Sequence, residues 1–187
     1  MQFVDFYAKK NLQNSKFVCN FAVSFEHTHN STMKKLKLYL DTSVISHLDA
    51  PDTPEKTAET LAFWEILKTG KYDVVISDVV MDEIRRCTEL KRMLMIVKIA
   101  EIKPITVEKN EEVEALAHEY VRNNILSQRS FDDCRHIALS VVNSCDYLVS
   151  WNFKHLVNVR TVAGVKVVNA INNYREISIV SPNMLIE

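Results

Sequence analysis

Short apolar runs alternate with longer amphipathic segments over most of this chain. Strands that alternate with helices are typical of β-α-β units, in which the strands run parallel and helices cover both faces of the sheet. We therefore predict an α/β fold, a three-layer α/β/α sandwich with a central parallel sheet. The predicted strands are 36–41, 72–77, 102–107, 147–150 and 177–180, and the predicted helices are 54–69, a segment capped by Asp78, 89–100, 108–126, 132–144 and 157–173.

Glycine is scarce, because the 187 residues contain only Gly70 and Gly164. Phosphate-binding loops of the G-x-G-x-x-G and P-loop types need several glycines in one turn. The sequence therefore excludes dinucleotide-binding and P-loop enzymes. A formal net charge of -1 also excludes a uniformly basic surface for nucleic acid, although it leaves room for a local basic face.

The first 32 residues differ from the rest of the chain in composition and in hydrophobic periodicity. They are rich in Asn, Ser, Phe and His and show no sustained helical or strand period, whereas Met33 leads directly into an alternating apolar run at 36–40. We predict that 1–32 is an N-terminal extension outside the fold, that Met33 is the natural start, and that 33–187 forms one domain. No Gly/Ser/Pro-rich linker divides that domain.

The four cysteines lack C-x-x-C spacing, so we interpret them as buried thiols rather than as a disulfide framework or a zinc site. Free thiols are typical of a reducing compartment. No run of 18 apolar residues indicates a membrane span, and the N-terminus lacks the pattern of a signal peptide. We expect a cytoplasmic protein without a membrane partner.

Three acidic residues from distant segments are expected at one edge of the sheet. Asp41 follows the first strand, Glu83 lies on the helix after the second strand, and Asp133 opens the helix that leads into the fourth strand. The active site of an open parallel sheet lies at the carboxyl ends of its strands. Carboxylates that converge there repel one another unless a cation neutralises them, and oxygen ligands suit Mg²⁺ or Mn²⁺.

Each acid also has a purely structural interpretation. Asp41 could cap a turn, Asp133 could be an ordinary acid at a helix N-terminus, and Glu83 could pair with Arg86 on a solvated face. The combined position of the three at one edge favours a site. A phosphoacceptor receiver domain and an aspartate phosphatase are both disfavoured, because the expected acidic partners are missing near Asp41.

Four segments carry a resemblance to a known family: 40–45 (LDTSVI), 77–84 (SDVVMDEI), 133–139 (DCRHIAL) and 145–156 (CDYLVSWNFKHL). In this order and spacing they resemble the PIN-domain ribonucleases, most closely the VapC-type toxins of toxin–antitoxin pairs. The resemblance implies an α/β/α domain and an endoribonuclease that depends on Mg²⁺ or Mn²⁺. It implies RNA as the substrate and an antitoxin protein as a partner.

The resemblance also implies roles for individual residues. Asp41, Glu83 and Asp133 would be the catalytic acids and metal ligands, with Ser43 supporting Asp41. The family often has a fourth acid after the fourth strand, where this chain has Asn152. That difference puts a second metal ion in doubt and leaves an alternative open: a catalytically weakened PIN-like module that binds RNA or protein.

Signals for binding partners come from two further segments. Lys154, Arg160 and Lys166 lie in a stretch without acids, and they predict either a positive rim for RNA phosphates or a solvated helix face. His136 and His155 are interpreted as structural. The apolar run 93–96 makes the 89–100 helix apolar on several sides, which predicts a partner face for a second copy, giving a homodimer, or for an antitoxin helix.

Overall fold

The computed structural model describes residues 34–186. The predicted N-terminal extension at 1–32 and the proposed start at Met33 lie outside the described residues. The described part confirms the predicted fold class, because it forms one all-parallel sheet with helices on both faces.

The sheet has five strands in the order β3-β2-β1-β4-β5. Each strand pairs in parallel with its neighbours; Tyr39, for example, lies in register with Val75 on one side and with Leu148 on the other. β1 is therefore the central strand, and its residues Leu38, Tyr39 and Leu40 are fully buried. The strands are β1 (Lys37–Leu40), β2 (Asp73–Ser77), β3 (Ile105–Val107), β4 (Tyr147–Val149) and β5 (Ser178–Val180).

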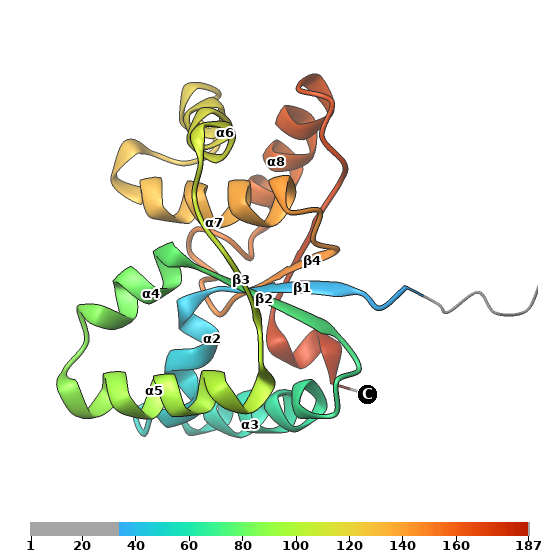
Figure 1. Ribbon diagram of the computed structural model, residues 1–187. Helices are drawn as coiled ribbons and strands as arrows, with labels where there is room; N and C mark the ends of the chain where they lie inside the picture. Colours follow the sequence, from blue (N-terminus) through green and yellow to red (C-terminus); the bar gives the residue numbers. More distant parts are fainter. Residues whose placement is uncertain (1–33, 187) are drawn as a thin grey trace, which may run out of the picture. The chain divides into compact units, whose positions relative to one another are not determined.

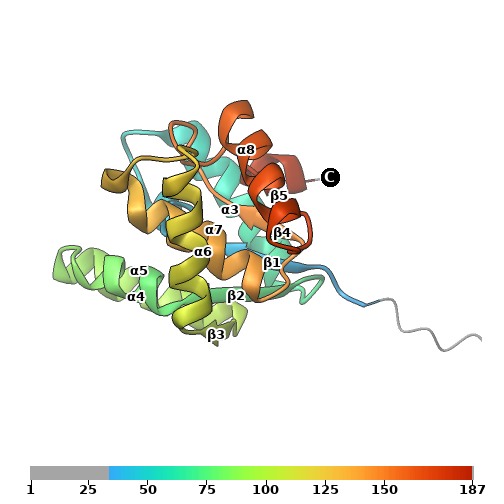
Figure 2. The same ribbon diagram turned by 90° about the horizontal axis from the view of Figure 1, so that it is seen from above.

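Helices cover the two faces of the sheet. Figure 1 shows α2, α3 and α5 on one side of the strands and α6, α7 and α8 on the other, and the view from above shows the second group lying over the sheet (Figure 2). The α-helices are α2 (Thr42–Ser46), α3 (Pro54–Lys68), α4 (Asp78–Arg85), α5 (Glu89–Ile102), α6 (Glu111–Arg122), α7 (Phe131–Val142) and α8 (Val159–Ile171). Three short 3₁₀ helices are η1 (His47–Asp49), η2 (Gln128–Ser130) and η3 (Pro182–Leu185).

Several details of the predicted elements are wrong. The strand predicted at 102–107 begins only at Ile105, because Ile102 still belongs to α5. The cap of α4 is Ser77 rather than Asp78, because the Ser77 hydroxyl accepts from the Val80 amide at 3.4 Å while the Asp78 carboxylate binds Lys109 at 2.7 Å. The helix predicted at 108–126 is shorter, since Asn110 caps its start and Asn124 takes a left-handed φ of 55° just beyond its end. The short helix α2 was not predicted.

The strand order makes β1 the topological switch point of the sheet. The chain moves from β1 outward to β2 and β3, then returns to β4 on the other side of β1. The first residues after β1 and β4 and the start of α4 therefore converge at one edge, as expected for the switch point of an open parallel sheet. In residues 34–186, no helix combines the length and the apolar character that crossing a bilayer requires.

Candidate metal centre

Asp41 is the first residue after β1 and is 5% exposed. Its Oδ2 atom accepts hydrogen bonds from the Ser43 hydroxyl at 2.6 Å and from the Ser150 hydroxyl at 2.5 Å. Ser43 in turn accepts from the backbone amide of Trp151 at 2.9 Å. Hydroxyls from α2 and from the residue after β4 thus fix the orientation of this carboxylate, and Ser43 lies beside Asp41 as the family resemblance implies.

Glu83 reaches the same edge from α4. Its Oε2 atom accepts from the Thr42 hydroxyl and lies 3.3 Å from Nε2 of His136. Burial alone raises the pKa of Glu83, but the hydrogen bond and charge of His136 and the hydrogen bond from Thr42 outweigh it, so that the pKa lies below its ordinary value. Glu83 is therefore held as an ionised carboxylate, and Nε2 of His136 lies close to both Glu83 and Asp41.

His136, which we interpreted from the sequence as structural, completes the group. It lies on α7, is 1% exposed, and its Nε2 atom is 3.6 Å from Oδ1 of Asp41. One ligand atom each from Asp41, Glu83 and His136 lies within 4.8 Å of the other two. The available signal was position: His136 follows Asp133 by three residues, so the two share one face of α7.

Asp133 lies beside this triad rather than within it. Its Oδ1 atom accepts from the Asn152 side-chain amide at 2.9 Å. Burial raises the pKa of Asp133, and the negative charges of Asp41 and Glu83 raise it further, whereas the histidines nearby lower it. The three predicted acids therefore do share one electrostatic environment, with Asp133 at its rim.

Asn152 links the rim of the site to the segment after it. Its side-chain amide donates to Asp133, and its Oδ1 accepts from the His155 backbone amide at 3.0 Å. At the position where the resembling family often has a fourth acid, this chain thus has a neutral side chain that holds Asp133 in place. Asp146, the residue before β4, accepts from the Lys37 backbone amide at 2.8 Å and therefore has a structural role away from the site.

A basic cleft of about 390 Å³ lies next to Asn152. Lys154, His155 and Arg160 line it together with Asn158 and Ser127. Lys166, predicted as part of the same basic rim, does not line this cleft and instead forms an ion pair with Glu176. The basic residues that follow one another in the sequence therefore separate in the fold: Lys154 and Arg160 line the cleft, and Lys166 does not.

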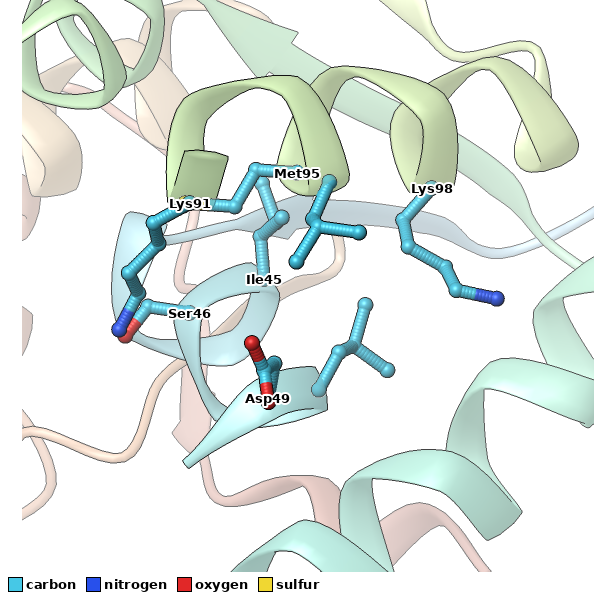
Figure 3. A pocket seen from close by; sticks show the side chains of 8 residues that line it. Ile45, Ser46, Asp49, Lys91, Met95 and Lys98 are labelled. Carbon is cyan, nitrogen blue, oxygen red and sulfur yellow. The ribbon is translucent and has the colours of Figure 1, made fainter. Parts of the chain in front are cut away.

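A second hollow, of about 300 Å³, lies between α5 and the α2–η1 segment. Figure 3 shows Lys91, Met95 and Lys98 of α5 facing Ser46 and Asp49 across it. Met95 is buried, whereas five other apolar residues of α5 are exposed: Leu90, Met93, Leu94, Ile96 and Val97. The predicted homodimer or antitoxin face on this helix stays a prediction, with Met95 excluded from the exposed part.

Thiol chemistry is disfavoured at the two buried cysteines that the structure describes. Cys87 is only half-buried, so the interpretation of the cysteines as buried thiols is wrong for that residue. Burial raises the pKa of Cys134 and of Cys145 to about 12, so neither is a thiolate at neutral pH. Cys19 lies outside the described residues. The chemistry that the described site can support is therefore that of carboxylates, an imidazole and a cation.

Comparison with known proteins adds no assignment: no protein-family model matches the chain, and no curated protein matches it significantly. The resemblance to PIN-domain ribonucleases therefore depends on the four sequence segments and stays a prediction.

Replacing Asn152 by aspartate tests whether negative charge is already crowded around Asp133. Asn152→Asp would remove the hydrogen bond to Asp133 and set two carboxylates against each other, so we expect a loss of about 2 kcal/mol in the free energy of unfolding in EDTA. Mn²⁺ should restore most of the loss. Urea unfolding with and without metal measures both effects.

Asn158→Asp is the matched control, because Asn158 caps α8 and aspartate also caps well. It adds the same charge outside the acidic group and should change stability little. Equal stability of the Asn152→Asp variant and the parent protein in EDTA would contradict the charge crowding inferred here.

Proposed function

We propose that this protein is a metal-dependent ribonuclease that hydrolyses phosphodiester bonds in RNA, of the kind represented by the PIN-domain toxins that its sequence resembles. The observation that carries the proposal is the convergence of Asp41, Glu83 and His136, whose ligand atoms lie within 4.8 Å of one another at the carboxyl end of the central strand. Asp133 lies beside them at the rim of the same charged group.

The residues present fit a divalent ion. Carboxylate oxygens are preferred ligands of Mg²⁺ and Mn²⁺, and Asp41 and Glu83 would hold the ion with Asp133 available at the rim. When bound, such an ion neutralises charge on a phosphate and lowers the pKa of a water for attack. Without a cation, the clustered negative charges of this partly buried site repel one another. The bound ion would therefore also stabilise the fold.

The surrounding hydrogen bonds support a pre-organised site. Ser43 and Ser150 hold Asp41, Thr42 holds Glu83, and Asn152 holds Asp133. Because each carboxylate is already oriented by a neighbour on a different element, little reorganisation is needed before a ligand binds.

The basic cleft supports RNA as the substrate. Lys154 and Arg160 line a cleft that adjoins Asp133 through Asn152 and His155. Cationic side chains beside an acidic centre can hold the phosphates on either side of the bond that is cut. In this arrangement the cations of the basic cleft neutralise nearby RNA phosphates, although the net charge of the whole chain is only -1.

A non-catalytic binding module is the second candidate, and Asn152 favours it, because this neutral residue occupies the place of a fourth acid. In that case the protein would bind RNA through the basic cleft without cleaving it. An antitoxin segment or a second copy on α5 is compatible with either candidate and stays a prediction.

Cleavage of a fluorescently end-labelled single-stranded RNA separates the two candidates. We expect the parent protein to cut it in Mg²⁺ or Mn²⁺ and not in EDTA. Asp41→Asn combined with Asp133→Asn should reduce the rate more than about 100-fold, because the charge that holds the ion is lost.

Asp132→Asn is the matched control for that experiment. Asp132 is next to Asp133 on α7, but it is half exposed and pairs with Arg135 at 3.0 Å, outside the site. This variant should cleave at the parent rate. Cleavage by the double variant at the parent rate would contradict the proposal, and tight RNA binding without any cleavage by the parent would favour the binding module.

The salt dependence of RNA binding tests the basic cleft. Lys154→Ala with Arg160→Ala removes two cations, so the slope of log affinity against log salt should become shallower by about 1.4 for single-stranded RNA. Lys166→Ala should leave the slope nearly unchanged, because Lys166 is paired with Glu176. Fluorescence anisotropy in EDTA measures binding without cleavage, and equal slopes for all three proteins would exclude the cleft as the RNA site.

A further inference from the structure

We infer that His136 is a nitrogen ligand of the metal centre, and that the centre consequently takes Mn²⁺ in preference to Mg²⁺. The inference rests on the metal centre of the proposed function and assigns it a ligand that the sequence resemblance does not supply. The observation behind it is the position of Nε2 of His136 relative to the carboxylates of Asp41 and Glu83.

The distances fit a shared ion. Ligand atoms that each lie about 2.1 Å from one ion are separated from one another by about 3 to 4 Å. Nε2 of His136 is 3.3 Å from Oε2 of Glu83 and 3.6 Å from Oδ1 of Asp41. Both separations fall inside that interval, and no large movement of His136 is required.

The other side of the imidazole is held as a metal ligand requires. Nδ1 of His136 lies 2.8 Å from the Tyr39 hydroxyl, which lies 2.6 Å from the Ser77 hydroxyl. With its single proton on Nδ1, a neutral imidazole donates to Tyr39, and Tyr39 donates to Ser77. When a cation is bound, this tautomer would turn the lone pair of Nε2 toward the ion in place of the hydrogen bond to Glu83, and histidine ligands are commonly oriented by such a second partner.

Burial excludes some other roles. His136 is 1% exposed and Tyr39 is fully buried, so the imidazole lies beneath the carboxylates and is not a surface contact for RNA. A protonated Nε2 that donates to Glu83 would satisfy the same distances without any metal. The experiment must therefore distinguish a nitrogen–metal bond from a nitrogen–proton bond.

The donor set determines the preferred ion. Mg²⁺ strongly favours oxygen ligands, whereas first-row transition ions accept imidazole nitrogen as well as carboxylate oxygen. Two carboxylates with one imidazole therefore favour Mn²⁺ over Mg²⁺, which narrows the pair of ions expected from the sequence.

Pulsed electron paramagnetic resonance of Mn²⁺ bound to the full chain, without a histidine tag, tests the nitrogen directly. We expect electron spin echo modulation from ¹⁴N in the parent protein, replaced by the ¹⁵N pattern when histidine is ¹⁵N-labelled. His136→Gln should lose the modulation, bind Mn²⁺ at least about 10-fold more weakly, and lose part of the preference for Mn²⁺ over Mg²⁺.

His155→Gln is the matched control, because His155 is the other histidine near Asp133 and lies on the side of the basic cleft. It should keep the modulation and the Mn²⁺ affinity. Tyr39→Phe keeps the imidazole but removes its partner, so it should keep the modulation with altered coupling. It also provides a test if His136→Gln, checked by circular dichroism, does not fold.

The outcomes separate this inference from the proposed function. Mn²⁺ bound without ¹⁴N modulation in the parent protein would overturn the assignment of His136 and leave the carboxylate centre standing. Modulation that disappears in His155→Gln would overturn it as well. Failure of the parent protein to bind Mn²⁺ at all would contradict the metal centre itself.

Discussion

A buried carboxylate at the end of the central strand determines the rest of the site. Asp41 is 5% exposed, and an uncompensated charge at that depth costs several kcal/mol. Within the fold, two serine hydroxyls donate to one oxygen of Asp41, while the other oxygen lies 3.6 Å from Nε2 of His136. Glu83 adds a second negative charge to the same few ångströms, and this concentration of charge is the physical basis for proposing a cation there.

The topology explains why these residues meet although they are far apart in sequence. β1 lies between β2 and β4, so the segment after β4 brings Ser150 to Asp41, and α4, which begins directly after β2, brings Glu83. α7 packs over the sheet before leading into β4 and carries both Asp133 and His136. The site therefore depends on β2, β1 and β4 being neighbours in the sheet.

Much of this was predictable from the sequence, because strands end where apolar runs end. The placement of Asp41 and Glu83 at one edge of the sheet follows from that rule and from the parallel order of the strands. The support of Asp41 by Ser43 was implied only by the family resemblance. His136 was missed because its neighbours Ile137 and Ala138 belong to the core, and only the side-chain contacts with Tyr39 and Glu83 reveal its direction. Lys166 was wrongly predicted to belong to the basic rim, because Glu176, which neutralises it, approaches only in the folded chain.

The central claim is that this edge of the sheet binds a divalent cation through Asp41, Glu83 and His136. A crystal structure of the protein grown with Mn²⁺, with anomalous scattering recorded for manganese, tests it most directly. We expect a strong anomalous peak between the two carboxylates, within bonding distance of Nε2 of His136. A peak elsewhere on the surface, or no peak with Nε2 of His136 still hydrogen-bonded to Glu83, would contradict this assignment.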